Sequence, residues 1–291
     1  MVLTQLLLNS LIIGGLYALV AAGFSLIYST NKFMHFAHGT SVVAGGYFLY
    51  AFYSLNHFPF WLAVITTLFC TALLGAGMYK IIYEPLQKRK ASNVILLIAS
   101  IGILILFQNI IQLIFGASIQ TISIQSNTTY TILGAAITQL QIIIISISIL
   151  LYFILTWMMY HTTLGKHMRA VADNPGLAKI IGIDPKKIAL WSFILGATLA
   201  GIAGILIGLE QNLEPSMGTG LMIKGFTGAV IGGVESVGGA VLGSYILGAA
   251  ENFGVWYLPS GYKDGIAFIL LFLFLLLKPS GLFGIRKGAK Q

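Results

Sequence analysis

Long apolar stretches separated by short polar segments run along almost the whole chain. Seven of them approach the length of a membrane-spanning helix, which needs about 20 mostly apolar residues. They are Leu6–Tyr28, His38–Leu55, Phe60–Tyr83, Val94–Phe115, Leu140–Tyr160, Ile188–Leu209 and Ala240–Tyr257. Two shorter stretches follow the same pattern, Leu221–Gly233 and Ile266–Leu277. The pattern predicts an all-α, polytopic transmembrane helical bundle of eight or nine spans, with residues 1–291 forming one domain.

The composition agrees with a protein that lies in lipid. The chain is 57% hydrophobic and 8% charged, whereas soluble domains average about 25% charged residues. The net charge of +8 does not indicate nucleic-acid binding, because the basic residues lie between apolar runs and form no groove-sized patch. The single cysteine, Cys70, excludes a disulfide framework and offers no metal site. No Lys or Arg precedes the first run, so we interpret it as a retained span and not as a secretory signal.

The distribution of basic residues predicts an orientation. If all nine runs cross and the N-terminus is outside, fourteen Lys and Arg residues lie inside and only Lys224 and Lys263 lie outside. Residues 162–187 and the basic tail 279–291 are then cytoplasmic, and the uncharged loop 116–139 is outside. This orientation requires that Leu221–Gly233 crosses the membrane, as a half-length or broken helix. If it did not cross, the basic tail would lie outside.

Glycine is concentrated in one part of the chain, with 15 of the 34 glycines between Gly196 and Gly254. Three GxxxG pairs lie there, at 204/208, 228/232 and 239/243, and this spacing favours close helix packing in membranes. The stretch GGVESVGG, Gly232–Gly239, interrupts two apolar runs, and a similar break follows the first span near His38-Gly39. Paired breaks at membrane depth point to a transport path. The predicted path residues are Phe36, His38, Gly39, Gly232, Gly233, Glu235, Gly238 and Gly239.

A charged segment, His161–Lys187, contains seven of the 24 formal charges. Asn174-Pro175 is typical of a helix start and Gly182 of a helix end, so the segment predicts a helix of about two turns. Its apolar residues, Leu177, Ile180 and Ile181, have no core of their own so far from the spans. The helix either docks into a groove of another protein or lies on lipid headgroups, and the residues alone leave both open.

Catalytic and nucleotide-binding motifs are absent from the sequence: there is no P-loop, no HExxH and no GxSxG. We therefore expect no enzyme activity and no cofactor bound by this chain. Glu251 is the main ionisable residue inside a span, and a structural hydrogen bond to a neighbouring helix is favoured over a substrate role. For His35 and His38, a packing or helix-start role is favoured over metal binding.

Three stretches carry a family resemblance: MHFAHGTSVVAGGY, RAVADNPGLAKIIGID and AVIGGVESVGGAVLGSYILG, with the ending LLLKPSGLFG. They closely resemble the membrane permeases of branched-chain amino acid ABC importers, from about Gly14 to Gly284. The resemblance implies that residues 173–182 are the coupling helix that docks on an ATPase. The family's leading acidic residue is not evident, which leaves the role of Asp173 open. The coupling residues are Asp173, Asn174, Pro175, Leu177, Ala178, Ile181 and Gly182.

The resemblance also implies partner chains. These are a second, similar permease, two P-loop ATPase subunits that hold ATP and Mg²⁺, and an extracytoplasmic substrate-binding protein. Leucine, isoleucine and valine are the leading substrates, and permeases for urea and short-chain amides look alike. A self-sufficient secondary transporter or channel is the alternative class, and it would need coupling-ion ligands for which Glu251 is the only candidate carboxylate.

Overall fold

A computed structural model describes residues 2–123, 128–132 and 134–284 of the chain. Its long apolar segments are helical, because a helix satisfies every backbone polar group within the segment where no water is available. The helices are α1 (Val2–Asn31), α2 (His38–Leu49), α3 (Phe60–Gly77), α4 (Glu84–Lys88), α5 (Asn93–Phe115), α6 (Gln139–His161), α7 (Thr163–Asp173), α8 (Pro175–Ile180), α9 (Pro185–Glu210), α10 (Met217–Gly232), α11 (Val237–Gly254) and α12 (Lys263–Leu277). Two π-helical segments, Tyr50–Leu55 and Met78–Tyr83, extend α2 and join α3 to α4, and a 3₁₀ turn, Ser260–Tyr262, precedes α12.

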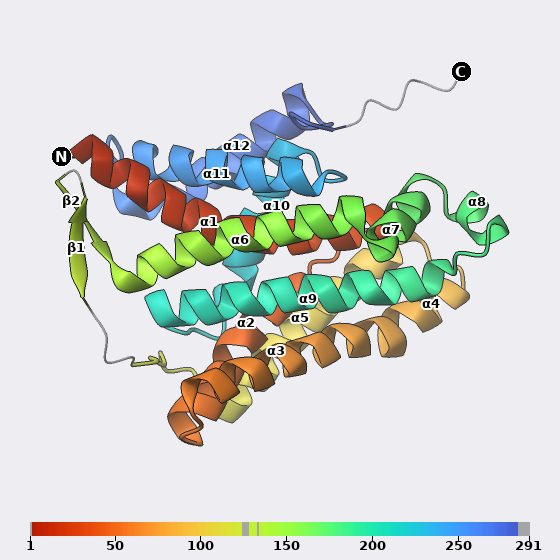
Figure 1. Cartoon of the computed structure of the whole chain (residues 1–291), viewed down its shortest axis with the longest axis horizontal. Helices are drawn as coiled ribbons and strands as arrows, with labels where there is room; N and C mark the ends of the chain where they lie inside the picture. Colours follow the sequence, from red (N-terminus) through yellow and green to blue (C-terminus); the bar gives the residue numbers. More distant parts are fainter. Residues whose placement is uncertain (1, 124–127, 133, 285–291) are drawn as a thin grey trace.

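The all-α expectation holds for most of the chain, with one small exception. The strands β1 (Thr129–Ile132) and β2 (Ala135–Thr138) form an antiparallel hairpin in the segment expected to be an uncharged loop. Figure 1 shows this hairpin beside the start of α1 at one end of the bundle, with α7 and α8 at the other end. Among the predicted tail residues 279–291, residues 285–291 lie outside the described part of the chain.

The number of spans differs from the expected eight or nine. Six helical segments in the described residues are long and apolar enough to cross a membrane, or seven if the α10–α11 pair counts as one span. The α2 run is an α-helix of only 12 residues before its π-helical continuation. The α10 and α11 axes bend by 114° at a short break, so the broken helix is confirmed and the count is corrected. Hydropathy could not reveal the bend, because both arms are equally apolar.

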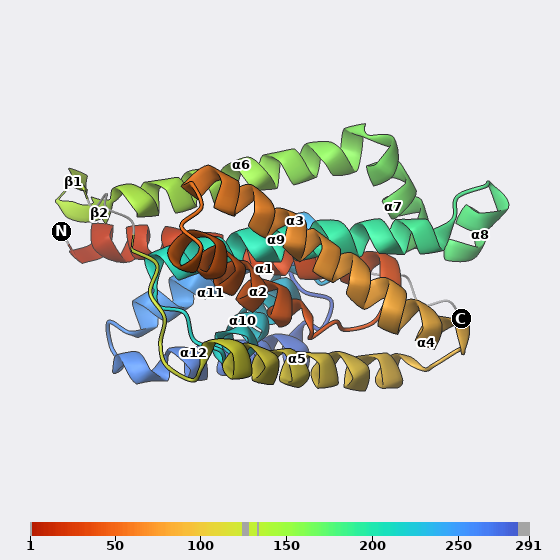
Figure 2. The same ribbon diagram turned by 90° about the horizontal axis from the view of Figure 1, so that it is seen from below.

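The first helix forms the centre of the bundle. Of its most apolar window 89% is buried, compared with 72% for α9 and 6–22% for α3, α5, α6 and α12. Figure 2 shows α6 and α5 on opposite sides of the layer that contains α1 and α9. The peripheral helices therefore present apolar side chains outward, as lipid-facing helices do.

The predicted packing role of the GxxxG glycines is confirmed. A Cβ atom on Gly204 would collide with the backbone of Val42, and one on Gly243 would collide with the backbone of Gly228. Gly232 and Gly239 lie backbone to backbone where α10 meets α11. These contacts let α9 approach α2, and α10 approach α11, more closely than larger residues would permit.

Candidate functional site

The short helix expected within residues 173–182 is present as α8, and the residues predicted to cap it lie at its two ends. The Asn174 side chain accepts hydrogen bonds from the backbone N–H groups of Gly176 and Leu177, both at 3.0 Å. Pro175 occupies the first turn, where its missing N–H needs no partner. Gly182 has a φ of +87° just after the helix, a conformation that glycine adopts without strain. Asp173 lies outside α8, as the last residue of α7, so the expected helical range 173–182 is corrected to Pro175–Ile180.

Sequence reasoning missed α7 as a separate helix. Its Met168 and Val171 are buried and pack with Ile188 and with Ala178 of α8 in one apolar cluster. The Thr162 hydroxyl caps the helix by accepting from the backbone N–H of Gly165 at 3.1 Å. The apolar spacing on one face of α7 could have revealed it. This helix anchors α8 at the end of the bundle.

The remaining large apolar residues of α8, and Ile181 directly after it, point away from the protein. Leu177, Ile180 and Ile181 are 61%, 80% and 72% exposed, whereas Ala178 is 2% exposed. Three large apolar side chains on one short, anchored helix form a contiguous exposed patch of the kind that marks interaction sites. We call these three residues the α8 patch.

The first group of predicted path residues lies deep in the bundle. The His38 side chain is fully buried, and its Nε2 lies 3.1 Å from the backbone oxygen of Val20. Gly39 lies against the backbone of Gly218 at the start of α10. The ring of Phe36 packs on that of Phe226 with centroids 5.6 Å apart. These contacts join the start of α2 to α1 and α10.

The second group forms the linker between α10 and α11, and this linker is held on several sides. Glu235 forms an ion pair with Lys32, directly after α1, at 2.9 Å. The hydroxyl of Ser25 donates to the backbone oxygen of Val234 at 2.8 Å. The linker is therefore bound to the C-terminal end of α1 and not suspended in the middle of the bundle.

The chain after α12 completes the fastening of this linker. The backbone N–H groups of Leu282 and Phe283 donate to the carbonyls of Ile231 and Gly232 at 2.8 and 2.9 Å. They satisfy carbonyls that the end of α10 leaves free. Gly233 has a φ of +111° and lies against Gly281 and Gly284. We call residues 278–284 the C-terminal strap.

The two predicted groups do not line one open cavity. A cavity of about 610 Å³ lies between α3, α6 and α9, and none of the predicted path residues lines it. Each group instead packs on neighbouring elements: Phe36 on Phe226 of α10, and Glu235 on Lys32, directly after α1.

The sequence indicated only Glu251 from a cluster of ionic residues in α10, α11 and α12. Glu251 of α11 is fully buried, accepts a hydrogen bond from the Tyr17 hydroxyl at 2.9 Å, and lies 3.6 Å from the Lys224 ammonium. Lys224 also pairs with Asp264 at 2.9 Å. The favoured structural hydrogen bond of Glu251 is thus present. Lys224, which the charge count assigned to the outer side, lies within α10 with its side chain only 17% exposed. Lys224 and Glu251 each lie within an apolar run, and this could have indicated from the sequence that they form a pair.

His35 lies in a cluster of aromatic rings. Its Nδ1 lies 2.9 Å from the Tyr83 hydroxyl, and its ring packs against Phe193 with centroids 4.8 Å apart. Within the described residues no group of three or more His, Cys, Asp and Glu side chains could hold a metal ion.

Comparisons with known proteins cover nearly the whole chain. The family model for the permease component of branched-chain amino acid transport systems matches residues 6–275. The chain is 33% identical to BraD of Pseudomonas aeruginosa, a high-affinity branched-chain amino acid transport system permease protein, over 96% of this chain and 95% of the relative. It is 30% identical to LivH of Escherichia coli, over 96% and 95%. It is also 30% identical to a probable LivH of Methanocaldococcus jannaschii, over 97% and 92%.

Proposed function

This chain belongs to the family of permease components of branched-chain amino acid transport systems, and we propose that it forms the path of an ATP-driven importer for leucine, isoleucine and valine together with a second, similar permease. A transport permease is not itself an enzyme. Two partner P-loop ATPase subunits supply ATP and Mg²⁺ chemistry, and an extracytoplasmic binding protein delivers the ligand. Uptake of labelled leucine and labelled urea by cells that express the complete system separates this substrate class from the amide class.

The single observation that carries the coupling part of the proposal is the α8 patch. Its three side chains are 61–80% exposed on a helix whose other apolar residue, Ala178, is buried in the bundle. Fully burying one such side chain stabilises a contact by about 1.5–3 kcal/mol. Leu177 and Ile181 lie one turn apart. Their exposure is explained if both side chains insert into a groove on an ATPase subunit.

The test compares Leu177→Ala with Leu177→Asp at equal permease levels. Leu177→Ala should weaken retention of the ATPase partially, and Leu177→Asp should weaken it further because an unpaired charge enters the contact. Tyr130→Asp is the matched control, since Tyr130 is 49% exposed in the β1–β2 hairpin, outside every span and at the other end of the bundle from α8. ATPase co-purification and substrate uptake are measured. If Leu177→Asp retains both, α8 is a headgroup-bound linker and the coupling assignment fails.

The orientation follows from charge. The α8 end is cytoplasmic in this proposal, and the β1–β2 end faces outward across a bacterial cytoplasmic membrane. Support comes from three basic residues at and directly after the end of α4, Lys88, Arg89 and Lys90, since Figure 1 shows α4 toward the α8 end. A membrane-impermeant thiol reagent applied to intact cells should label Tyr130→Cys in the hairpin and spare Lys179→Cys in α8.

The path residues remain a proposal that rests on the two backbone breaks. The C-terminal strap and the Lys32–Glu235 pair hold the α10–α11 linker against α1, and we assign to them the closed state of the cytoplasmic mouth. Phe36→Cys and Gly238→Cys, on a Cys70→Ala background, probe the path without the collision that a side chain at Gly39 would cause. Reagent access at both should change with nucleotide state in the assembled transporter. Uniform protection in every state would contradict the path.

A further inference from the structure

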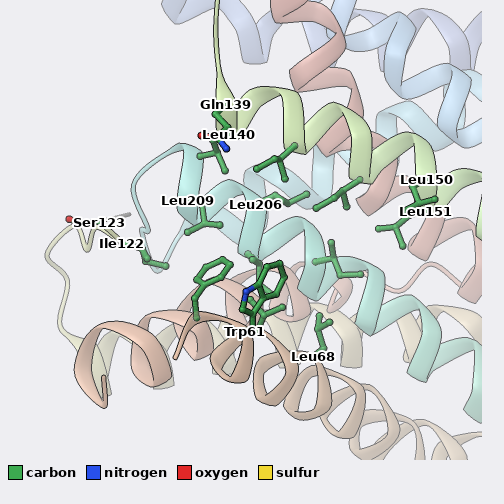
Figure 3. Close-up of a pocket in the computed structure, with 16 residues that line it drawn as sticks. Trp61, Leu68, Ile122, Ser123, Gln139, Leu140, Leu150, Leu151, Leu206 and Leu209 are labelled. Carbon is green, nitrogen blue, oxygen red and sulfur yellow. The ribbon is translucent and has the colours of Figure 1, made fainter. Parts of the chain in front are cut away.

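The cavity of about 610 Å³ has a composition unlike that of a polar substrate site. Sixteen of the described residues, from α3, α6, α9 and the loop after α5, line it, and none of these sixteen is charged. Its polar side chains are Ser123, Gln139 and the indole N–H of Trp61. Figure 3 shows Gln139, Ser123 and Trp61 toward one end and Leu68 and Leu151 toward the other. The cavity is therefore an apolar groove with polar groups near one end.

The groove is flanked by helices that face lipid. Only 22% of the apolar window of the α3 segment and 17% of that of α6 is buried. The more buried helix α9 provides the wall between them, with Ile205 and Leu206 only 5% and 3% exposed. A molecule in this groove would touch residues that lipid on the outer surface of the bundle does not reach.

The apolar lining of the groove determines which class of molecule can bind there. A free amino acid carries an ammonium and a carboxylate, and burying either without a charged or hydrogen-bonded partner is strongly unfavourable. A hydrocarbon chain has no such requirement. A cavity of about 150 Å³ holds one benzene molecule, so about 610 Å³ accommodates a substantial length of acyl chain.

The length of the groove matches one membrane leaflet. Along α6 it extends from Gln139 to Leu151, which at 1.5 Å per residue is about 18 Å. Half of a hydrocarbon core of about 30 Å is about 15 Å. Tryptophan and polar side chains at the mouth suit the headgroup level, where aromatic residues gather.

We propose that the groove between α3, α6 and α9 binds an acyl chain of a phospholipid from the leaflet at the hairpin end, with the headgroup beside Ser123 and Gln139. The lipid fills the space between two spans that both pack on α9. This site is separate from α8 and from the predicted path, so it does not depend on either.

The test uses phosphatidylglycerol that carries a diazirine in the middle of its acyl chain. The purified permease is reconstituted in vesicles that contain this lipid, irradiated and digested, and labelled residues are located by mass spectrometry. The wild-type chain should carry label on residues 202–206 of α9. No label there would overturn the proposal, and this measurement needs no variant.

A matched pair of variants sharpens the test. Ile147→Trp fills the groove and should reduce α9 labelling severalfold. Ile154→Trp is the control, because Ile154 is 50% exposed on the same helix and does not line the groove; it should leave α9 labelling unchanged. Equal labelling in both variants would refute the site. Competition by free leucine, or a disulfide between Ile147→Cys and a cysteine of a second permease chain, would assign the groove to substrate or protein and would also refute it.

Discussion

The two ion pairs of Lys224 predict which contacts hold α10 in place. Its ammonium lies 3.6 Å from the fully buried Glu251 carboxylate and 2.9 Å from Asp264, whose side chain is 72% exposed. Lys224→Met removes the cation and keeps an unbranched apolar stem. Asp264→Asn removes only the exposed partner.

The magnitude follows from the burial of each partner. At 3.6 Å and an effective dielectric constant of about 20, the Lys224–Glu251 attraction is about 4–5 kcal/mol before desolvation. Removing one member of a buried pair costs about 3–5 kcal/mol, because the remaining charge stays buried without its partner. An exposed pair such as Lys224–Asp264 contributes about 0–1 kcal/mol. Lys224→Met should therefore lower the free energy of unfolding several times more than Asp264→Asn does.

Thermal unfolding of the purified protein in detergent measures the difference. A loss of about 3–5 kcal/mol corresponds to a fall in Tm on the order of 10 °C. The double variant Lys224→Met with Glu251→Gln should recover much of this loss, since the neutral amide oxygen still accepts from the Tyr17 hydroxyl. The reasoning is refuted if the double variant melts no higher than Lys224→Met, or if Asp264→Asn melts as low.

Three further predictions concern packing, fastening and capping. Gly243→Leu should reduce the amount of assembled protein because its side chain collides with the Gly228 backbone, whereas Gly102→Leu, with open space around it, should not; size-exclusion chromatography measures both. Lys32→Gln should raise thiol access at Gly238→Cys without nucleotide, and Lys32→Glu with Glu235→Lys should restore protection if the ion pair holds the linker. Asn174→Ala removes two capping hydrogen bonds and should destabilise α8 by about 1 kcal/mol. Retention of the ATPase should then fall by up to about fivefold. Asn174→Asp keeps an acceptor and should retain binding.

Local signals were sufficient for part of the candidate site. The ends of α8 follow from Asn174-Pro175 and Gly182, because capping depends on residues within one turn of each helix end. The apolar residues left without a core in this segment predicted the exposed α8 patch. The close packing of Gly243 followed from its spacing to Gly239, since GxxxG places both glycines on one helix face.

Other features required the fold. The apolar runs predicted eight or nine crossings and a break at Gly232–Gly239. Hydropathy shows only that a segment can lie in lipid and not the direction of its helix axis, so the 114° bend between α10 and α11 could not be predicted. The partner of Glu251 could not be identified either, because Lys224 and Tyr17 lie 27 and 234 positions away in the sequence. The same holds for the C-terminal strap, whose backbone bonds to α10 depend on no side chain.

A helical membrane bundle with a capped helix outside the spans followed from short stretches of the chain, because burial in lipid and helix capping are properties of short segments. Which helix faces meet could be read only from the folded chain. The tertiary structure placed Lys224 beside Glu251, fastened the α10–α11 linker to α1 and to the strap, and opened a groove between α3 and α6. The physical reason is that lipid supplies no hydrophobic drive to pair particular apolar helices, so the pairing depends on shape and on a few polar contacts between residues far apart in the chain.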